Sequence, residues 1–280
     1  MDRTVLITGA SSGFGLRASV ALARRGWHVL ATMRDLGRRA LLEDAARAAG
    51  VLERIEIHPL DVTNAGQIEA ITSELGHRPV PLDAIVNNAG FALPGFADDV
   101  TDAELRQQLD TNFFGAAAVT RAFLPQLRRQ GFGHIVMISS VSGRMGFAGI
   151  GSYSASKFAL EGWTESLRYE MLPLGIQVVL IEPGAFETDI WTRNAKIAAN
   201  LANPASPNAA RVGRWRKKIE GQQKKADPQP VIDRIVAVLE NPRPKLRYVV
   251  GRDAKMGLLL RHLLPWPVFE WVIRKNTGLE

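Results

Sequence analysis

The stretch Thr8-Gly9-Ala10-Ser11-Ser12-Gly13-Phe14-Gly15 decides the fold, because it joins an apolar strand pattern, Val5–Thr8, to an amphipathic helix pattern, Gly13–Arg25. Glycines let the backbone turn tightly and approach a ligand closely. The free N–H groups and the positive dipole end of the following helix suit a pyrophosphate. A glycine-rich turn without a ligand is the alternative, but its position between a strand and a helix favours a dinucleotide site. We therefore expect the dinucleotide to contact Gly9, Ser11, Ser12, Gly13, Phe14 and Gly15.

The rest of the first 185 residues alternates in the same way, with short Val/Ile/Leu-rich runs between longer Ala-rich amphipathic stretches. This alternation predicts an α/β fold, a doubly wound Rossmann sheet of parallel strands with helices on both faces. The expected strands are Val5–Thr8, Val29–Thr32, Ile55–Pro59, Ala84–Asn87, His134–Ser139, Gln177–Glu182 and, near the C-terminus, Arg247–Val250. The expected helices are Gly13–Arg25, Arg38–Ala49, Ala65–Leu75, Asp102–Arg129, Ser152–Leu172 and Pro230–Glu240.

The alternation of strand and helix patterns ends after Pro183-Gly184. A polar and basic helical segment is expected over 189–225, with a break at Asn203–Asn208. No linker or repeat interrupts the chain. We therefore expect one domain over 1–280, with residues 189–228 as a helical substrate lid and residues 255–280 as a C-terminal extension.

Composition removes several classes of function. The 280 residues include no cysteine, which excludes disulfides, thiolate nucleophiles and Cys-based metal centres. The histidines lack metal-ligand spacing, so no metal is expected; they are His28, His58, His77, His134 and His262. No charged-then-apolar leader and no apolar run of membrane-spanning length are seen, which predicts a soluble cytoplasmic protein.

The net charge of +7 is concentrated between Arg193 and Lys225. A solvated helix face is the favoured interpretation, so no nucleic-acid partner is expected. Binding to nucleic acid, to a membrane or to an anionic handle on the substrate is the alternative. The C-terminal run Leu258–Ile273 contains Trp266, Phe269 and Trp271. Packing of this run on the lid or on a partner subunit is expected, with peripheral membrane contact as the alternative.

The end of the second strand bears on the choice between NAD(H) and NADP(H). An acid there would bond the ribose 2′-OH and repel a 2′-phosphate. This strand ends Ala31-Thr32-Met33-Arg34, and a guanidinium group suits a phosphate. We expect a preference for NADP(H) through Arg34. NAD(H) stays open, because Asp35 is adjacent and Arg34 can also point to solvent.

A second group of residues suggests proton transfer. Tyr153 and Lys157 are four apart on a predicted helix, so they share one face. A lysine cation beside a tyrosine, together with an oxidised nicotinamide, favours the phenolate and lowers the tyrosine pKa. Ser140 at the end of the fifth strand is placed to bond a substrate oxygen. Asn112 lies inside the predicted helix Asp102–Arg129, an unfavourable position that suggests a specific role.

Together these residues resemble the short-chain dehydrogenase/reductase family. The matching pieces occur in the family's order: Thr8-Gly9-x-x-x-Gly13-x-Gly15, Asp61, Asn87-Asn88-Ala89-Gly90, Asn112, Ser140, Tyr153-x-x-x-Lys157, and Pro183-Gly184 with Thr188. The resemblance covers residues 4 to 190 and implies a sheet of seven parallel strands, often assembled into homodimers or homotetramers. Phe14, where Ile or Leu is commoner, is a small departure.

The resemblance also implies roles for these residues. Tyr153 would be the proton donor or acceptor, Lys157 would bind the nicotinamide ribose, and Ser140 would orient the substrate oxygen. Asn112 would hold a water that links Lys157 to solvent. The remaining cofactor contacts would be Asp61 and Val62 near adenine, Asn88, Ala89 and Gly90 beneath the adenosine ribose, and Pro183, Gly184 and Thr188 at the nicotinamide.

Two further stretches, Phe158-Ala159-Leu160-Glu161-Gly162 and Ala31-Thr32-Met33-Arg34-Asp35, are similar to the hydroxysteroid and retinol dehydrogenase branch. We therefore expect an NADP(H)-dependent oxidoreductase for lipophilic secondary alcohols or ketones. The rival hypothesis is a regulator that senses NADP(H) and binds nucleic acid or membrane through its basic lid. Large, mostly apolar residues are expected to line the substrate pocket: Phe91, Leu93, Val141, Met145, Phe147, Phe186, Ile190 and Trp191. The alternative for about half of them is an ordinary core position.

Overall fold

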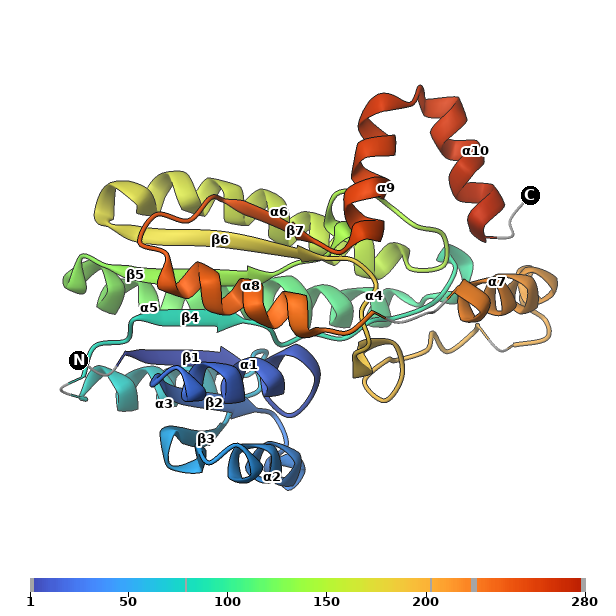
Figure 1. The fold of residues 1–280 in the computed structure, drawn as a ribbon. Coiled ribbons are helices and arrows are strands. Elements are labelled where there is room, and N and C mark those ends of the chain that lie inside the picture. The colour runs from blue at the N-terminus through green and yellow to red at the C-terminus, as the bar shows by residue number, and fades with distance from the viewer. Residues whose placement is uncertain (1–2, 79, 202, 223–225, 278–280) are drawn as a thin grey trace.

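The computed structural model describes residues 3–78, 80–201, 203–222 and 226–277, which form a parallel sheet of seven strands (Figure 1). The strand order is β3-β2-β1-β4-β5-β6-β7. Each expected strand is present, and its ends agree with the sequence prediction to within one residue. The strands are β1 (Thr4–Thr8), β2 (His28–Met33), β3 (Ile55–Pro59), β4 (Ala84–Asn87), β5 (Gly133–Ile138), β6 (Ile176–Pro183) and β7 (Arg247–Val250).

Helices cover both faces of the sheet, which confirms the doubly wound architecture. On one face, α1 (Gly13–Arg24), α2 (Ala40–Ala48) and α8 (Gln229–Glu240) bury the side chains of Val5 and Ile7. On the other, α3 (Ala65–Gly76), α5 (Ala116–Gln130) and α6 (Gly151–Met171) bury Leu6.

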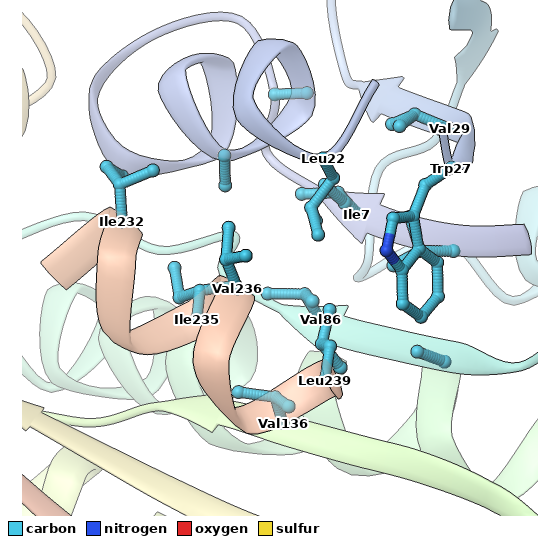
Figure 2. Packing of buried hydrophobic residues seen from close by; sticks show 14 of the residues in the cluster. Ile7, Leu22, Trp27, Val29, Val86, Val136, Ile232, Ile235, Val236 and Leu239 are labelled. Carbon is cyan, nitrogen blue, oxygen red and sulfur yellow. The ribbon is translucent and has the colours of Figure 1, made fainter. Parts of the chain in front are cut away.

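The alternation within β1 explains why its three central residues, Val5, Leu6 and Ile7, are all apolar: successive side chains enter different cores. Figure 2 shows the first of these cores, in which Leu22 of α1 and Ile235 of α8 pack near Ile7 and Val86 of the sheet.

The strand order reverses between β1 and β4, and this point positions the site. The chain runs from β1 and from β4 toward opposite halves of the sheet, and a crevice therefore forms at the carboxyl ends of these two strands. The backbone N–H of Ala10 donates to the carbonyl of Thr32, at 2.9 Å, so the glycine-rich turn lies beside the end of β2. The expected nucleotide residues of β1, β2 and β4 therefore meet at one edge.

The helix expected over Asp102–Arg129 contains a change of geometry. The chain forms α4 (Asp102–Leu109), a π-helical segment (Asp110–Gly115) and then α5. The wider turn contains Asn112, whose side chain bonds the backbone of Phe91. Such widened turns occur often at functional sites.

The prediction of a helix over the first part of the lid was wrong. After a 3₁₀ turn (Asp189–Trp191) the chain runs through irregular turns until α7 (Ala209–Gln222). Backbone N–H groups of this stretch bond distant partners: Lys196 donates to Ala92, and Ala198 donates to Pro94, both at 2.9 Å. These tertiary bonds replace the i→i−4 bonds that a helix would need. Residues 202 and 223–225 of the expected lid lie outside the described residues.

The C-terminal extension forms a hairpin of α9 (Arg252–Leu263) and α10 (Trp266–Thr277), interrupted at Leu264 and Pro265. Figure 1 shows this hairpin and α7 at the end of the sheet to which the strand arrows point. None of the described helices is long and apolar enough to cross a membrane. Residues 278–280 lie outside the described part of the chain.

The packing of Phe123 gives a test of the core beneath the sheet. Its side chain is 0% exposed in α5. We expect Phe123→Ala to lower the free energy of unfolding by about 3–5 kcal/mol, because the substitution removes buried area and leaves a cavity. Urea denaturation followed by circular dichroism measures this change. The control Phe132→Ala removes an exposed ring and is expected to change stability by less than about 0.5 kcal/mol. Equal losses in both variants would contradict the packing.

Candidate active site

The glycine-rich turn and the end of β4 lie in direct backbone contact. Gly9 has a φ of +70°, and a Cβ there would lie 2.8 Å from the Cα of Ala89. A Cβ on Gly15 would lie 2.4 Å from the carbonyl oxygen of Gly9. The amide of Asn88 donates to the carbonyls of Thr8 and Gly9, at 2.9 and 3.0 Å. Only glycines fit at these positions, and Asn88 and Ala89 hold the turn against the end of β4.

The start of α1 fits a bound pyrophosphate. Ser12 precedes the helix in an extended conformation and makes no side-chain cap, and the first turn contains no acid. The N–H groups and positive dipole end are therefore free of a competing anion. Thr188 lies across this turn, since a Cβ on Gly13 would be 3.7 Å from the Cβ of Thr188. The turn, the helix end and Thr188 together form a cradle of the kind that the dinucleotide requires.

Arg34 is exposed immediately after β2, at the same edge. The neighbouring acid is occupied, because the carboxylate of Asp35 accepts a hydrogen bond from the N–H of Gly37 at 2.9 Å. Asp35 thus caps a local 3₁₀ turn. Two residues that the sequence did not indicate also lie here. Asn194 donates to the hydroxyl of Ser12 at 2.9 Å, and Arg38 donates to the amide oxygen of Asn194 at 3.0 Å.

The other expected cofactor residues also lie around this edge. Asp61 accepts hydrogen bonds from the N–H and hydroxyl of Thr63, and Val62 packs against Gly115. Gly90 lies against Asn112, because a Cβ on Gly90 would be 3.0 Å from its amide oxygen. Pro183 ends β6, and Gly184 lies against Asp253 at the start of α9.

Tyr153, Lys157 and Ser140 come together at the carboxyl ends of β5 and β6. Tyr153 and Lys157, in the first turns of α6, are each 4% exposed. The ammonium of Lys157 donates to the carbonyl of Ile138 at 2.8 Å and lies 5.7 Å from the ring centre of Tyr153. Ser140 stands one residue beyond the expected strand end and begins the 3₁₀ turn Val141–Gly143. Its hydroxyl accepts the N–H of Ser142 at 3.1 Å.

Asn112 bonds residues on both sides of this group. Its amide oxygen accepts the N–H of Phe91, and its amide donates to the carbonyl of Phe91 and to the hydroxyl of Ser156, at 3.0 and 3.1 Å. Ser156 in turn donates to the carbonyl of Tyr153 at 2.7 Å. Asn112 therefore connects the segment after β4 to the helical turn that contains Tyr153.

Burial controls the protonation of the central pair. It raises the pKa of Tyr153 to about 12, against the lowering effect of a hydrogen bond with Ser140. It lowers the pKa of Lys157 to about 8, partly opposed by the nearby carboxylate of Glu161. The lowered tyrosine pKa that the sequence suggested is therefore not found in the protein alone, because burial penalises the phenolate more than the neighbouring groups favour it.

A buried charge network that sequence reasoning missed lies beside this pair. The carboxylate of Glu182, on β6, is 0% exposed and accepts hydrogen bonds from Arg144 at 3.2 Å. Arg247, on β7, bridges Glu182 at 3.3 Å and Glu161 at 3.1 Å, and it also pairs with Glu165. An acid inside the otherwise apolar run Gln177–Glu182 was the available signal.

This network fixes the segment that contains Ser140. Arg144 directly follows the turn Val141–Gly143, so its bond to Glu182 ties that turn to β6. Gly143 touches α6, since a Cβ there would lie 2.9 Å from the Cγ of Glu161 and 3.0 Å from the carbonyl of Lys157. The turn is thus held on one side by an ion pair and on the other by close packing.

The expected substrate residues divide into separate clusters. Trp191 packs edge-to-face on Tyr153, with ring centres 5.2 Å apart, and Ile190 precedes it in the same turn. Phe91 and Leu93 pack with residues of the 189–228 segment, including Leu201 and Trp215. Val141, Met145 and Phe147 pack with the α9–α10 hairpin. Phe186 instead packs 6.2 Å from Phe14 within the main core, so the core alternative holds for this residue.

Two surface cavities lie away from Tyr153. One, of about 340 Å³, is lined by Thr4, His28 and Glu56 at the other end of the sheet. The second, of about 650 Å³, lies between α1 and α8. Trp191 lies against the ring of Tyr153, which is 4% exposed, so the described chain surrounds this ring closely.

Comparison with known proteins identifies similar chains. The family model described as short chain dehydrogenase matches residues 3–198. An uncharacterized oxidoreductase, YusZ, of Bacillus subtilis is 40% identical over 280 residues, which cover 98% of both chains. Retinol dehydrogenase 8 of Homo sapiens is 38% identical over 256 residues, which cover 88% of this chain and 80% of that one.

Solved structures show the same fold. The crystal structure of a short-chain dehydrogenase from Streptomyces avermitilis has a TM-score of 0.81 and 35% identity, and the match covers 98% of both chains. The structure of ElxO with NADP bound has a TM-score of 0.76 at 22% identity, and the match covers 91% of this chain and all of that one.

Glu182 provides a test of the buried network through pH. Burial raises the pKa of its carboxyl to about 7, and the charge of Glu161 raises it further. The folded protein thus holds this proton more tightly than the unfolded chain. The resulting stabilisation is present at acidic pH and is lost as the pH rises through about 7. When the pH rises from about 5 to about 8, we expect the free energy of unfolding of the wild type to fall by about 2 kcal/mol more than that of Glu182→Gln.

Urea denaturation at the two pH values gives the comparison. Glu165→Gln, which removes another carboxylate bound to Arg247, is the control and should keep the wild-type pH dependence between those values. A parallel loss in the wild type and Glu182→Gln would show that this carboxyl does not titrate there.

Proposed function

The chain belongs to the short-chain dehydrogenase family and is an oxidoreductase, and we propose that it transfers a hydride between NADP(H) and a lipophilic secondary alcohol or ketone. The observation that carries this proposal is the buried group of Tyr153, Lys157 and Ser140 at the sheet edge that also forms the nucleotide crevice. Proton transfer and hydride transfer need the proton donor and the hydride donor at one place. A dinucleotide bound at this edge would lie beside Tyr153.

The nicotinamide dinucleotide would lie along the carboxyl edge of the sheet. The turn from Gly9 to Gly15 and the start of α1 would hold the pyrophosphate, and Thr188 would hold the carboxamide. Asp61 and Val62 would contact adenine, and Asn88, Ala89 and Gly90 the adenosine ribose. Arg34 would pair with the 2′-phosphate of NADP(H), since the competing acid Asp35 is engaged in its cap. The bound dinucleotide supplies or accepts the hydride.

Tyr153 would exchange the proton. In reduction its hydroxyl gives a proton to the carbonyl oxygen, and in oxidation the phenolate takes one from the alcohol. A pKa of about 12 keeps Tyr153 protonated in the protein alone. The positive charges of Lys157 and of the oxidised nicotinamide would favour the phenolate when both surround it. The hydroxyl of Ser140 would hold the substrate oxygen in line.

Lys157 and Asn112 would support proton exchange. Lys157 would bind the nicotinamide ribose, and Asn112 would hold a water that links Lys157 to solvent. The bonds from Asn112 to Phe91 and Ser156 hold its side chain in one position beside α6.

The apolar side chains near Tyr153 support the proposal of an apolar substrate. Trp191 lies on the tyrosine ring, and the clusters around Phe91 and Met145 present apolar side chains from the 189–228 segment and the C-terminal hairpin. We propose that residues 189–228 act as the substrate lid. The similarity to a retinol dehydrogenase, a protein named for a lipophilic alcohol, agrees with this substrate class.

The rival hypothesis of a regulator is unsupported by the comparisons. Several cations of the basic lid also have partners within the chain: Arg193 pairs with Asp189 at 2.7 Å, and Arg211 lies 5.4 Å from the ring centre of Phe96. Assembly into a homodimer or homotetramer remains part of the proposal. Phe114 and Phe158, exposed on neighbouring helical segments, offer an apolar surface for it.

Replacement of the proton donor tests the mechanism. We expect Tyr153→Phe to lower kcat for ketone reduction by about 10²–10⁴-fold, because the substitution removes the hydroxyl that would give the proton. NADPH affinity, measured by fluorescence titration, should be nearly unchanged. Tyr169→Phe, which removes an exposed hydroxyl from the same helix, is the control and should keep full activity. A Tyr153→Phe enzyme with most of its rate would refute the assignment.

The role of Arg34 is tested by cofactor affinity. We expect Arg34→Ala to weaken NADPH binding about tenfold or more, because a charge-assisted bond to the 2′-phosphate is lost. NADH binding should not change, since NADH lacks that phosphate. Calorimetry on the wild type, Arg34→Ala and the control Arg47→Ala measures both cofactors. Equal wild-type affinity for NADPH and NADH would assign the enzyme to NAD-linked chemistry instead.

A further inference from the structure

The C-terminal hairpin of α9 and α10 has an outer surface rich in large apolar side chains. Three of them, Met256, Leu259 and Leu263, are 50–64% exposed and lie three and four residues apart, so they form one stripe along α9. Trp266, Val268 and Trp271 of α10 are 45–56% exposed. Isolated exposed apolar residues are ordinary, but here six exposed apolar residues occur within sixteen residues of one hairpin, and we refer to these six as the patch.

The inner side of the same hairpin is already used. Phe269 and Ala254 are buried against Val141 and Met145, and a Cβ on Gly257 would lie 2.6 Å from the terminal methyl of Met145. The expected contact of the C-terminal run with the lid is present between α10 and α7, and Phe269 packs in addition against Val141 and Met145. Trp266 and Trp271 are exposed in the single chain. The hairpin joins an exposed apolar surface directly to the proposed substrate wall.

The charges around the patch are mostly positive. Within the described residues 252–277, five cations (Arg252, Lys255, Arg261, Arg274 and Lys275) accompany two acids. One of these acids, Asp253, accepts a hydrogen bond from the N–H of Ala185. Arg261 lies 4.4 Å from the ring centre of Trp266, and Lys275 lies 4.8 Å from that of Trp271.

Tryptophans paired with cations beside aliphatic side chains suit the boundary between anionic headgroups and acyl chains. A symmetric contact between two copies of the hairpin would instead bring like charges together. The charge pattern therefore favours a lipid surface over a second copy of the chain.

We propose that the α9–α10 hairpin docks this enzyme on an anionic phospholipid surface, from which an apolar substrate reaches the wall formed by Val141 and Met145. The docking rests on the hairpin's own surface. The delivery of substrate rests on the proposed function. Both helices have 12 residues, too few to span a bilayer, so they would lie in the plane of the interface.

Vesicle co-sedimentation of the full chain tests the docking without any need for turnover. The probes are vesicles of phosphatidylcholine alone and of phosphatidylcholine mixed with phosphatidylglycerol. We expect binding to the mixed vesicles, weakened by salt, and little binding to phosphatidylcholine. Leu263→Ser with Trp271→Ser should reduce the partition coefficient about tenfold or more, because two interfacial side chains are lost. Arg274→Gln with Lys275→Gln should reduce the preference for anionic lipid.

The control is Tyr169→Ser, which removes an equally exposed aromatic side chain from α6 and should bind vesicles like the wild type. NADPH binding by each variant verifies its fold. Absence of wild-type binding, or equal binding by the Leu263/Trp271 variant, would overturn the proposal. A hairpin variant that changes the oligomeric mass in solution, with no vesicle binding by the wild type, would assign the patch to a second copy. Retained activity in Tyr153→Phe would refute the proposed function and would leave these vesicle-binding outcomes unaffected, so the two proposals fail separately.

Discussion

The contact between the backbone at Gly9 and the backbone at Ala89 is the constraint on which the rest of the site depends. No side chain fits between them, and the amide of Asn88 bonds both carbonyls of the turn. This contact sets the first turn of α1 against the end of β4, where the strand order reverses. Because all strands are parallel, the ends of β5 and β6 reach the same edge. The residues proposed for proton transfer therefore share one edge with the proposed nucleotide crevice.

The buried electrostatics follow from that placement. Residues that meet at the edge of a doubly covered sheet are removed from water. Burial shifts their pKa values in the direction that favours the neutral form of each side chain. Tyr153 is held as a neutral acid, whereas Lys157 keeps its charge only up to a pKa of about 8. Glu161, one turn along α6, favours the lysine cation. The network of Glu182, Arg144 and Arg247 anchors the turn after Ser140 to β6 and β7.

The sequence was sufficient to predict the sheet and the proximity of Tyr153, Lys157 and Ser140. Strands buried on both faces are apolar throughout, and the glycines that permit the first turn are visible as residue types. The elements that it did not predict depend on contacts between distant residues. The segment around Lys196 is irregular because its N–H groups bond Ala92 and Pro94. The π-helical turn at Asn112 occurs where that side chain bonds Phe91, a partner that local propensity does not contain. The high pKa of Tyr153 reflects burial, which spacing along a helix does not reveal.

In the proposed function, substrate recognition and chemistry come from different parts of the chain. The family model ends at residue 198, and all the residues of the catalytic group lie before it. The apolar partners of Phe91 and Leu93 include Leu201, Val212 and Trp215, and those of Val141 and Met145 include Ala254 and Phe269, all beyond that point. Family membership therefore accounts for the reaction class but not for the apolar clusters that are proposed to select the substrate. The wall built by α9 and α10 is also the structure whose outer face is apolar and basic. Selection of an apolar substrate and access to the surface where such substrates concentrate would then be properties of one hairpin.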